Sequence, residues 1–355
     1  MKKTAILVLL FAVASMVPWL FSNSAGAAPI VGPAPRPGPG YRVSGPYTNR
    51  NLSVFLIHGR DTIKSTNILT LEEAMAQKKV VVHETGNVNM LTVENKSDAI
   101  VFIQSGDIVK GGRQDRTMQY DLLIPPKSGL MQVPTFCVEH GRWSQRGSES
   151  SANFSGAANN VIGKPLKIAA KNAGDQVAVW AQVAEQQAKL KAAIPGIVAM
   201  PAAAPTSLNA TIDQREVAQA STDHIQRLAG IVTGKNDVVG YAFAINGKVN
   251  SADMYASNAL FVKLWPKLLK SSAIEAVSEQ QQGKTFGTPS QKEIMQLISS
   301  DEKSPGRTKI ANKDMSMTEE ERSDAYTYRT RWYSAPKEIR VGDDATVLHT
   351  NYLTK

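Results

Sequence analysis

The sequence lacks several features that would have decided its class at once. Cys137 is the only cysteine among 355 residues, which excludes a disulfide framework. Aromatic residues make up 6% of the chain and no dense run of lysine and arginine interleaves with them, so nucleic acid is not an expected partner. Only the N-terminus carries a long apolar run, which disfavours an integral membrane protein. The hydrophobic content of 42% can still fill a core, so disorder of the whole chain is excluded.

The first 27 residues have the order of a secretory signal. Lys2 and Lys3 precede an apolar run over residues 5–21, and the small residues Ala25-Gly26-Ala27 follow. We expect cleavage after Ala27 and therefore an exported protein, periplasmic or extracellular, of a bacterium. An uncleaved anchor helix is the alternative, which Pro18 disfavours. No stable membrane span is expected after cleavage.

The rest of the chain divides into a spacer and one folded body. Residues 28–42 carry five prolines, which predicts a stiff, extended spacer. For residues 43–355 we expect a single α+β domain with an antiparallel, β-rich core and several packed amphipathic helices. Residues 283–324 are polar, and we expect one short helix over residues 291–298 in an otherwise mobile insert.

Short runs of β-forming residues indicate many strands. They cover residues 52–57, 80–84, 88–94, 99–104, 107–110, 118–124, 130–139, 327–333 and 345–353. Because the connections are short, neighbouring runs should pair as antiparallel hairpins, and the last two should return to the main sheet. Asn246-Gly247 favours a type I′ turn between two further strands. Residues 141–163 are rich in glycine and serine and predict a loop.

Helices are indicated by apolar periodicity and by capping signals. The periodicity predicts helices over residues 165–193, 212–232 and 258–281. Thr70-Leu71-Glu72-Glu73 is a capping-box sequence, which predicts a short helix from Leu71 to Lys78.

The segment after the longest predicted strand gathers unusual chemistry. It brings the thiol of Cys137 close in sequence to the carboxylate of Glu139 and the guanidinium of Arg142. One interpretation makes Cys137 a nucleophile and Glu139 its acid or base. Alternation along a strand would turn His140 away from Cys137, so His140 is badly placed as the base. The other interpretation is a buried structural cysteine, because free cysteine is among the most buried residue types.

A glycine-rich turn is the second candidate site. In Gly111-Gly112-Arg113-Gln114-Asp115-Arg116, the glycines can turn backbone N–H groups toward an anion, and Arg113 and Arg116 can add forked donors. The alternative is a bulge whose arginines pair with nearby acids, namely Asp107, Asp115 or Asp121. The spacing of a P-loop is absent. The 5 histidines are scattered without metal-ligand spacing, so neither a metal nor a cofactor is expected.

Several short segments spread along the chain form one familiar pattern. They are Glu94–Ser97, Ser105–Asp107, Gly111–Arg116, Leu123–Pro125, Cys137–Trp143, Ala244–Lys248, Asp253, Ala259–Leu269 and Val347–Leu353. This combination resembles the ARG-and-rhodanese-phosphatase-superfamily-associated domain family (ARPP-type domain). The resemblance spans residues 43–355, which implies one domain whose signature residues converge in one site. The family takes its name from an association with ADP-ribosylglycohydrolases and implies no activity of its own.

These features favour a ligand-binding or structural module of the bacterial cell envelope or periplasm. Its polar cluster would comprise Arg113, Gln114, Arg116, Glu139 and Arg142, and an anion is the ligand that arginines prefer. The alternative is a hydrolase-like enzyme for a phosphate-containing or ADP-ribose-type compound, with Cys137 and Glu139 catalytic and the arginines holding the anion. A third possibility is an adaptor that binds a partner protein and extends toward it through the spacer and the polar insert.

Overall fold

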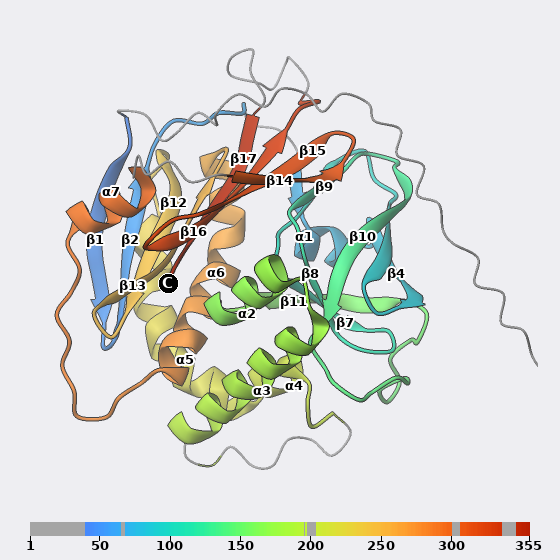
Figure 1. Ribbon diagram of the computed structural model, residues 1–355, viewed down its shortest axis with the longest axis horizontal. Coiled ribbons are helices and arrows are strands. Elements are labelled where there is room, and N and C mark those ends of the chain that lie inside the picture. The colour runs from blue at the N-terminus through green and yellow to red at the C-terminus, as the bar shows by residue number, and fades with distance from the viewer. Residues whose placement is uncertain (1–39, 65–67, 195, 197–203, 300–305, 336–345) are drawn as a thin grey trace, which may run out of the picture. The chain divides into compact units, whose positions relative to one another are not determined.

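The computed structural model describes residues 40–64, 68–194, 196, 204–299, 306–335 and 346–355, all within the unit Pro37–Lys355 (Figure 1). The predicted signal and nearly all of the predicted spacer lie outside these residues. The described part is an α+β arrangement in which antiparallel strand pairs predominate, as the sequence predicted.

The largest β-sheet, here the large sheet, is eight-stranded, with the order β1-β2-β12-β13-β17-β16-β15-β14. Its strands are β1 (Arg42–Asn49), β2 (Leu52–His58), β12 (Val238–Ile245), β13 (Lys248–Tyr255), β14 (Gly306–Asn312), β15 (Met315–Glu321), β16 (Ala325–Trp332) and β17 (Thr346–Thr354). Every pairing in it is antiparallel. The last two strands therefore return to the main sheet, which confirms the prediction.

Two further sheets are built from the segment between β2 and α2. The second sheet is six-stranded: β11 (Phe154–Val161), β7 (Asp107–Gly111), β8 (Arg116–Met118), β10 (Gly129–Cys137), β5 (Met90–Asn95) and β4 (Val80–Asn87). The small sheet is three-stranded: β3 (Ile68–Thr70), β6 (Ile100–Ile103) and β9 (Leu122–Ile124). β3 and β6 pair in parallel, unlike the hairpins predicted here. Apolar side chains of both sheets, Val93 and Val101 among them, share one core.

Helices lie against the large sheet and fill the space beside the second sheet (Figure 1). They are α1 (Leu71–Ala76), α2 (Lys164–Ile168), a π-helical turn (Ala169–Ala173), α3 (Gln176–Ala193), α4 (Leu208–Ile212), α5 (Arg215–Leu228), a 3₁₀ turn (Ala229–Val232), α6 (Asn258–Ser278) and α7 (Gln291–Ser299). α6 contributes to two apolar cores, through residues such as Leu264 and Ile274. α7 packs on another core, with Phe55 and Tyr352. None of the described helices is both long and apolar enough to cross a membrane.

Local signals located several elements correctly. The capping box at Thr70 is present, with reciprocal hydrogen bonds between Thr70 and Glu73. Asn246 and Gly247 have the positive φ angles of 52° and 77° that a type I′ hairpin requires. The single helix predicted over residues 165–193 is instead divided, because Gly174 adopts φ 57° and Asp175 caps a new helix.

Two stretches that were expected to lack strands contain them. β11 lies in the predicted loop over residues 141–163, and the hairpin β14–β15 lies in the predicted polar insert. β14 and much of β11 are exposed or half-buried, so their sequences lack the apolar alternation by which a strand is recognised. The helix predicted in the insert is present as α7.

Gly240 provides a test of how closely β12 and β13 pack. A Cβ at this position would lie 2.3 Å from the Asp253 backbone oxygen and 2.9 Å from the Met254 Cα. We expect Gly240→Ala to lower the free energy of unfolding by about 1–3 kcal/mol, because backbone cannot yield as a flexible side chain can. Denaturant unfolding measures this.

Gly156→Ala is the matched control for that substitution. Gly156 also lies in a strand, β11, but a Cβ there would meet no heavy atom within 4 Å. Its effect should stay within about 0.5 kcal/mol. Equal losses of stability for the two variants would contradict the proposed close packing.

Candidate functional site

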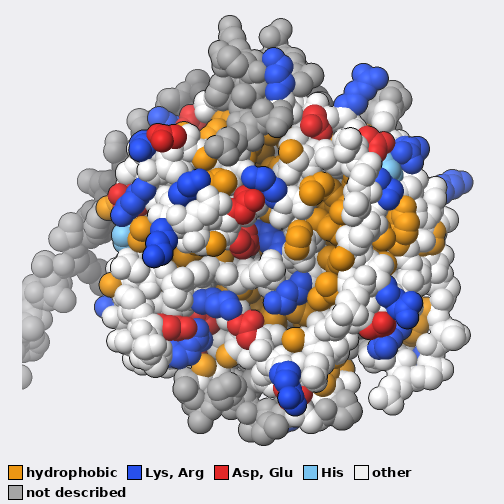
Figure 2. Space-filling model, turned by 180° about the vertical axis from the view of Figure 1, so that it is seen from behind, with side chains coloured by type: hydrophobic (Ala, Val, Ile, Leu, Met, Phe, Trp, Pro, Cys, Tyr) orange, Lys and Arg blue, Asp and Glu red, His pale blue; other side chains and the backbone are white. Residues whose placement is uncertain are grey.

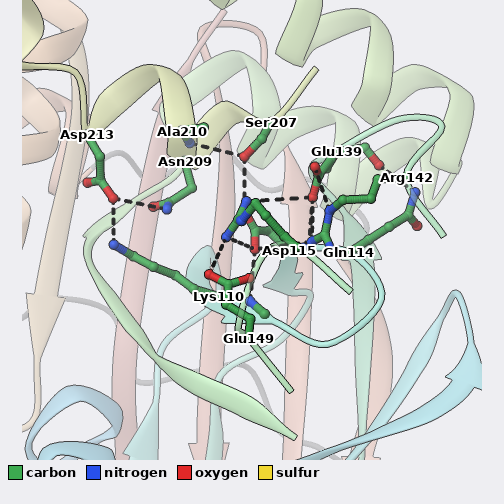
Figure 3. Close-up of polar contacts among 12 residues, drawn as sticks. Lys110, Gln114, Asp115, Glu139, Arg142, Glu149, Ser207, Asn209, Ala210 and Asp213 are labelled. Atoms are coloured by element: carbon green, nitrogen blue, oxygen red, sulfur yellow. Dashed lines mark hydrogen bonds and ion pairs between the residues drawn. The ribbon is translucent and has the colours of Figure 1, made fainter. Parts of the chain in front are cut away.

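The acids beside the predicted arginine site are already paired. Figure 3 shows Asp115 and Glu139, both fully buried, at the centre of a network of ion pairs. Arg142 donates from Nε to Glu139 Oε1 at 2.8 Å and lies 2.7 Å from Oε2 through its terminal nitrogen. Arg146 forks onto both oxygens of Asp115 at 3.0 and 3.1 Å. Sequence reasoning missed Arg146, which lies in the predicted loop.

The same network ties three chain segments together. Asp115 accepts hydrogen bonds from the Gly111 N–H and the Ser207 hydroxyl, each at 3.0 Å. Ser207 also caps α4 by accepting from the Ala210 N–H. Gln114 donates to the Glu139 backbone carbonyl at 2.9 Å. The predicted cluster therefore joins the turn between β7 and β8 to the end of β10 and to the start of α4.

The remaining two arginines differ in burial. Arg116 is fully buried and lies 3.4 Å from Glu84 through its NH2 group. Arg113 is partly exposed, and its guanidinium has no acidic partner among the described residues. Both guanidinium carbons lie near the Trp143 ring, at 5.5 Å for Arg113 and 5.6 Å for Arg116. Only Arg113 therefore retains a free charged end for a ligand.

Cys137 is held as a packed, protonated thiol. Its side chain is fully buried, and its Sγ lies 3.8 Å from the Val88 carbonyl oxygen. Burial, opposed by the charge of Arg116 and helped by Glu84 and Glu139, raises the pKa of Cys137 to about 11. His140 packs edge-on against Trp180, with 4.4 Å between ring centres. This environment favours the structural interpretation of the cysteine, since no base activates it.

The thiol gives a direct test, because the chain has no other cysteine. We expect Cys137 in the native protein to resist a thiol reagent at neutral pH and to react fully after denaturation, since both burial and the raised pKa suppress the thiolate. The absorbance change after adding one equivalent of a coloured-product thiol reagent measures the fraction of Cys137 that has reacted. Rapid, complete labelling of the folded protein with an unchanged Tm would restore the nucleophile interpretation.

A second group of ionisable side chains, here called the polar centre, lies deeper in the fold. It comprises Asp107, Asp121, Lys167, Lys171, Asp253, Tyr255, Lys267, His349 and Asn351, all of them buried. They come from β7, the segment between β8 and β9, α2, the π-helical turn, β13, α6 and β17. The centre therefore brings together strands of the large and second sheets, the segment that leads into β9 of the small sheet, and two helices.

His349 is the central residue of the polar centre. Its Nδ1 lies 2.9 Å from Asp121 Oδ2, and its Nε2 lies 3.0 Å from Asp253 Oδ1. Burial disfavours the charged ring, but Asp121 and Asp253 together raise the pKa of His349 above its ordinary value. The pKa of Asp121 is held well below its usual range by His349, against the effect of burial. Ionised carboxylates can only accept, so both ring nitrogens carry protons and the ring is an imidazolium.

Strand register places these groups together. In the pairing of β13 with β17, Asp253 lies opposite Asn351 and Tyr255 lies opposite His349. Residues two apart on a strand share a face, so all four side chains point the same way. Asn351 donates to Asp253 Oδ1 at 2.8 Å, and the Tyr255 ring stacks on His349 with 4.5 Å between centres.

Lysines from the helices complete the polar centre. Lys171 donates to Asn351 Oδ1 at 3.1 Å, and burial lowers the pKa of Lys171 to about 8. Lys267 lies 2.5 Å from Asp107 Oδ1 and 2.9 Å from Glu72 Oε1. Burial raises the pKa of Asp107 to about 7, with Glu72 adding to the rise and Lys267 opposing it.

Several polar atoms of this region have no hydrogen-bond partner among the described residues. They are the Asp253 Oδ2, the Tyr255 hydroxyl and both amide atoms of Gln104, the residue that donates its backbone N–H to Asp107. The Lys167 ammonium has no hydrogen bond or ion pair to a side chain within the described part of the chain, although its charge helps to lower the pKa of Asp253 against the effect of burial. Buried polar atoms are nearly always paired, so these groups call for a polar partner that the described residues do not supply.

The family comparison covers both clusters. The model of ARPP-1, the ARG and Rhodanese-Phosphatase-superfamily-associated Protein domain, matches residues 40–352. The chain belongs to this family. No curated protein and no solved structure matches it significantly. Among the described residues of this ARPP-1 chain, no group of three or more His, Cys, Asp or Glu side chains is placed to hold a metal ion.

The signature segments noted in the sequence do not converge in one site. Ser105–Asp107, Asp253 and residues 347–353 meet at the polar centre, whereas Gly111–Arg116 and Cys137–Trp143 form the ion-pair network around Asp115 and Glu139. The sequence had pointed to the second group as the site. Lys167 and Lys171 received no role there, because nothing local marks them, and Asp121 was considered only as a partner for the arginines, whereas it pairs with His349.

Opposite pKa shifts at two buried histidines test the imidazolium assignment. We expect His349 to titrate above its ordinary value of 6.5, and His224, where burial and Arg50 lower the pKa, to titrate below it. Because the folded pKa of His349 is raised, its contribution to stability is complete below the unfolded pKa and is lost as pH rises through the folded pKa. Two-dimensional NMR of the ring nitrogens, assigned with His349→Gln and His224→Gln, measures both. A His349 midpoint below that of His224 would contradict the assignment.

Proposed function

We propose that this protein is an exported ligand-binding module that holds a small anion at the polar centre. The observation that carries the proposal is a pair of buried donors without a partner among the described residues, the Tyr255 hydroxyl and the Gln104 amide, near the buried side chain of Lys167. Asp107, Asp121 and Asp253 all add to the raised pKa of Tyr255, after the larger effect of burial, which indicates how close these groups lie. An anion that still carries a proton, such as hydrogen phosphate, could accept from the donors and donate to Asp253 Oδ2.

The charge distribution on the surface indicates that a ligand is selected by the groups it contacts rather than attracted by a large surface patch of one charge. On the face in Figure 2, basic and acidic side chains are interspersed among the coloured residues, without a wide patch of one sign. A small ion would therefore be selected by what it meets inside the fold. Export is supported by the signal-like order of residues 1–27.

A hydrolase is the alternative, and the environment of Cys137 weighs against the version the sequence suggested. The thiol is protonated at neutral pH, and the nearest carboxylates, Glu84 and Glu139, raise its pKa. A nucleophile needs the opposite electrostatics. Binding without turnover is therefore the better-supported function.

The test is titration calorimetry of the purified protein with inorganic phosphate, followed by acetate and ADP-ribose. We expect phosphate to bind, and Lys167→Met to weaken binding by about tenfold or more, since each factor of ten is about 1.4 kcal/mol. A ligand at a hundred times its Kd adds about 2.7 kcal/mol to stability, so Tm should also rise by several degrees. Lys167 has no ion pair to lose among the described residues, so the variant should fold normally.

Arg113→Ala is the matched control, because Arg113 is the one arginine of the sequence-predicted cluster with a free guanidinium. Phosphate binding that survives Arg113→Ala but not Lys167→Met would support the polar centre. The reverse result would indicate that the anion binds at the glycine-rich turn instead. Absence of binding by every anion would refute the proposal, and hydrolysis of ADP-ribose to AMP and ribose 5-phosphate that is abolished by Cys137→Ser would establish the hydrolase instead.

A further inference from the structure

A cleft apart from both clusters opens where α2, α6 and the β12–β13 hairpin meet. Its volume is about 600 Å³, and its lining includes Lys164, Asn246, Asn250, Glu275, Glu279 and Phe286. A smaller hollow shares Pro165, Lys189 and both glutamates with it and extends to Gln186 on α3. Small-molecule sites usually occupy about 300–1,000 Å³, so the cleft has room for a ligand.

The walls of the cleft are fixed in the absence of a ligand. Asn51 donates to Asn246 Oδ1 at 3.1 Å and to the Ala276 carbonyl at 2.8 Å, and Asn246 donates to the Glu279 carbonyl at 2.7 Å. These bonds fasten the hairpin to the end of α6. A Cβ at Gly247 would lie 2.6 Å from the Gly287 carbonyl oxygen, so glycine lets the segment that carries Phe286 approach. A preformed cleft has little ordering cost on binding.

Two amide oxygens in this cleft lack donors. Asn250 is 8% exposed and donates to Glu275 Oε1 at 2.9 Å, but its own Oδ1 has no partner among the described residues. Gln186 Oε1, in the adjoining hollow, is also buried without a partner in the described part of the chain. An amide oxygen only accepts hydrogen bonds, so the ligand that completes this cleft must bring N–H or O–H donors.

The charges of the cleft are balanced or suppressed. Lys189 pairs with Glu185 at 3.0 Å and with Glu279 at 2.8 Å. Burial raises the pKa of Glu275 and lowers the pKa of Lys164, so both groups are driven toward their neutral forms. Lys248, exposed on the hairpin, also lines the cleft and has no ion-pair partner among the described residues; apart from this ammonium, an ionic ligand would find no uncompensated counter-charge. Phe286 and Pro165 add apolar surface on which the C–H face of a sugar ring can pack.

From the orphaned acceptors, the charge balance and the apolar rim, we propose that this cleft is a binding site for a neutral saccharide. The hydroxyl groups would donate to Asn250 Oδ1 and Gln186 Oε1, and the ring would pack against Phe286. This site is separate from the anion site proposed above and does not depend on it.

The experiment is saturation-transfer NMR and calorimetry of the purified protein with glucose, N-acetylglucosamine and their β-linked disaccharides. Glucosamine and glucuronate serve as the cationic and anionic counterparts. We expect a neutral sugar to bind and both charged counterparts to bind at least about tenfold more weakly. Phe286→Ala and Gln186→Ala should each weaken binding of the neutral sugar by a similar factor.

Trp143→Ala is the matched control, because Trp143 is an exposed aromatic residue that lies outside the cleft. Binding should survive this change and also Lys167→Met. Phe286 is half-buried, and the Gln186 side-chain oxygen has no hydrogen-bond partner among the described residues, so both variants should keep the native Tm. Failure of every neutral sugar to bind, preference for a charged counterpart, or binding unaffected by Phe286→Ala and Gln186→Ala would each overturn the proposal.

Discussion

The histidine held between two carboxylates is the interaction on which the arrangement of the sheets depends. Asp253 and His349 belong to the large sheet, whereas Asp121 lies between β8 of the second sheet and β9 of the small sheet. The Asp121 carboxylate also accepts from the Ser105 backbone and the Thr330 hydroxyl, at 2.8 and 2.6 Å. A buried charge left without its partner typically costs about 3–5 kcal/mol. Any arrangement that separates the sheets at this point would leave such charges behind, so the ionic triad specifies how they meet.

The buried lysines extend the same constraint to the helices. Lys267 fixes α6 to Asp107 at the start of β7, and Lys171 fixes the π-helical turn to Asn351 on β17. Apolar contacts would tolerate small slides of a helix along a sheet, whereas an ammonium in a dry interior must keep its acceptors. The π-helical turn is explained by the position of Lys171. Gly174 caps the end of the turn and α3 begins after Asp175, so the chain can change from one helix to the next while Lys171 stays in the polar centre.

Local structure was predictable because its signals are local. The capping box at Thr70, the Asn246-Gly247 turn and the apolar stripe of α6 each lie within one element. The candidate site was less predictable for the same reason. Asp121, Asp253 and His349 are far apart in sequence, and only strand register brings them together. Polar residues at alternate positions of β13 and β17 could have indicated the polar centre, because the core-facing side of a buried strand is usually apolar. Sequence also could not tell that Arg116 is buried against Glu84 while Arg113 is not.

α2 connects the two proposed binding sites. Lys164 lines the cleft and its backbone N–H donates to Glu275 at 3.3 Å, while Lys167, on the same face one turn later, reaches the polar centre. The charge of Lys167 also bears on Glu275, whose raised pKa it opposes. Gly163 sits at the start of this helix, where a Cβ would lie 3.0 Å from Glu275 Oε2, so glycine lets the start of α2 approach α6 closely.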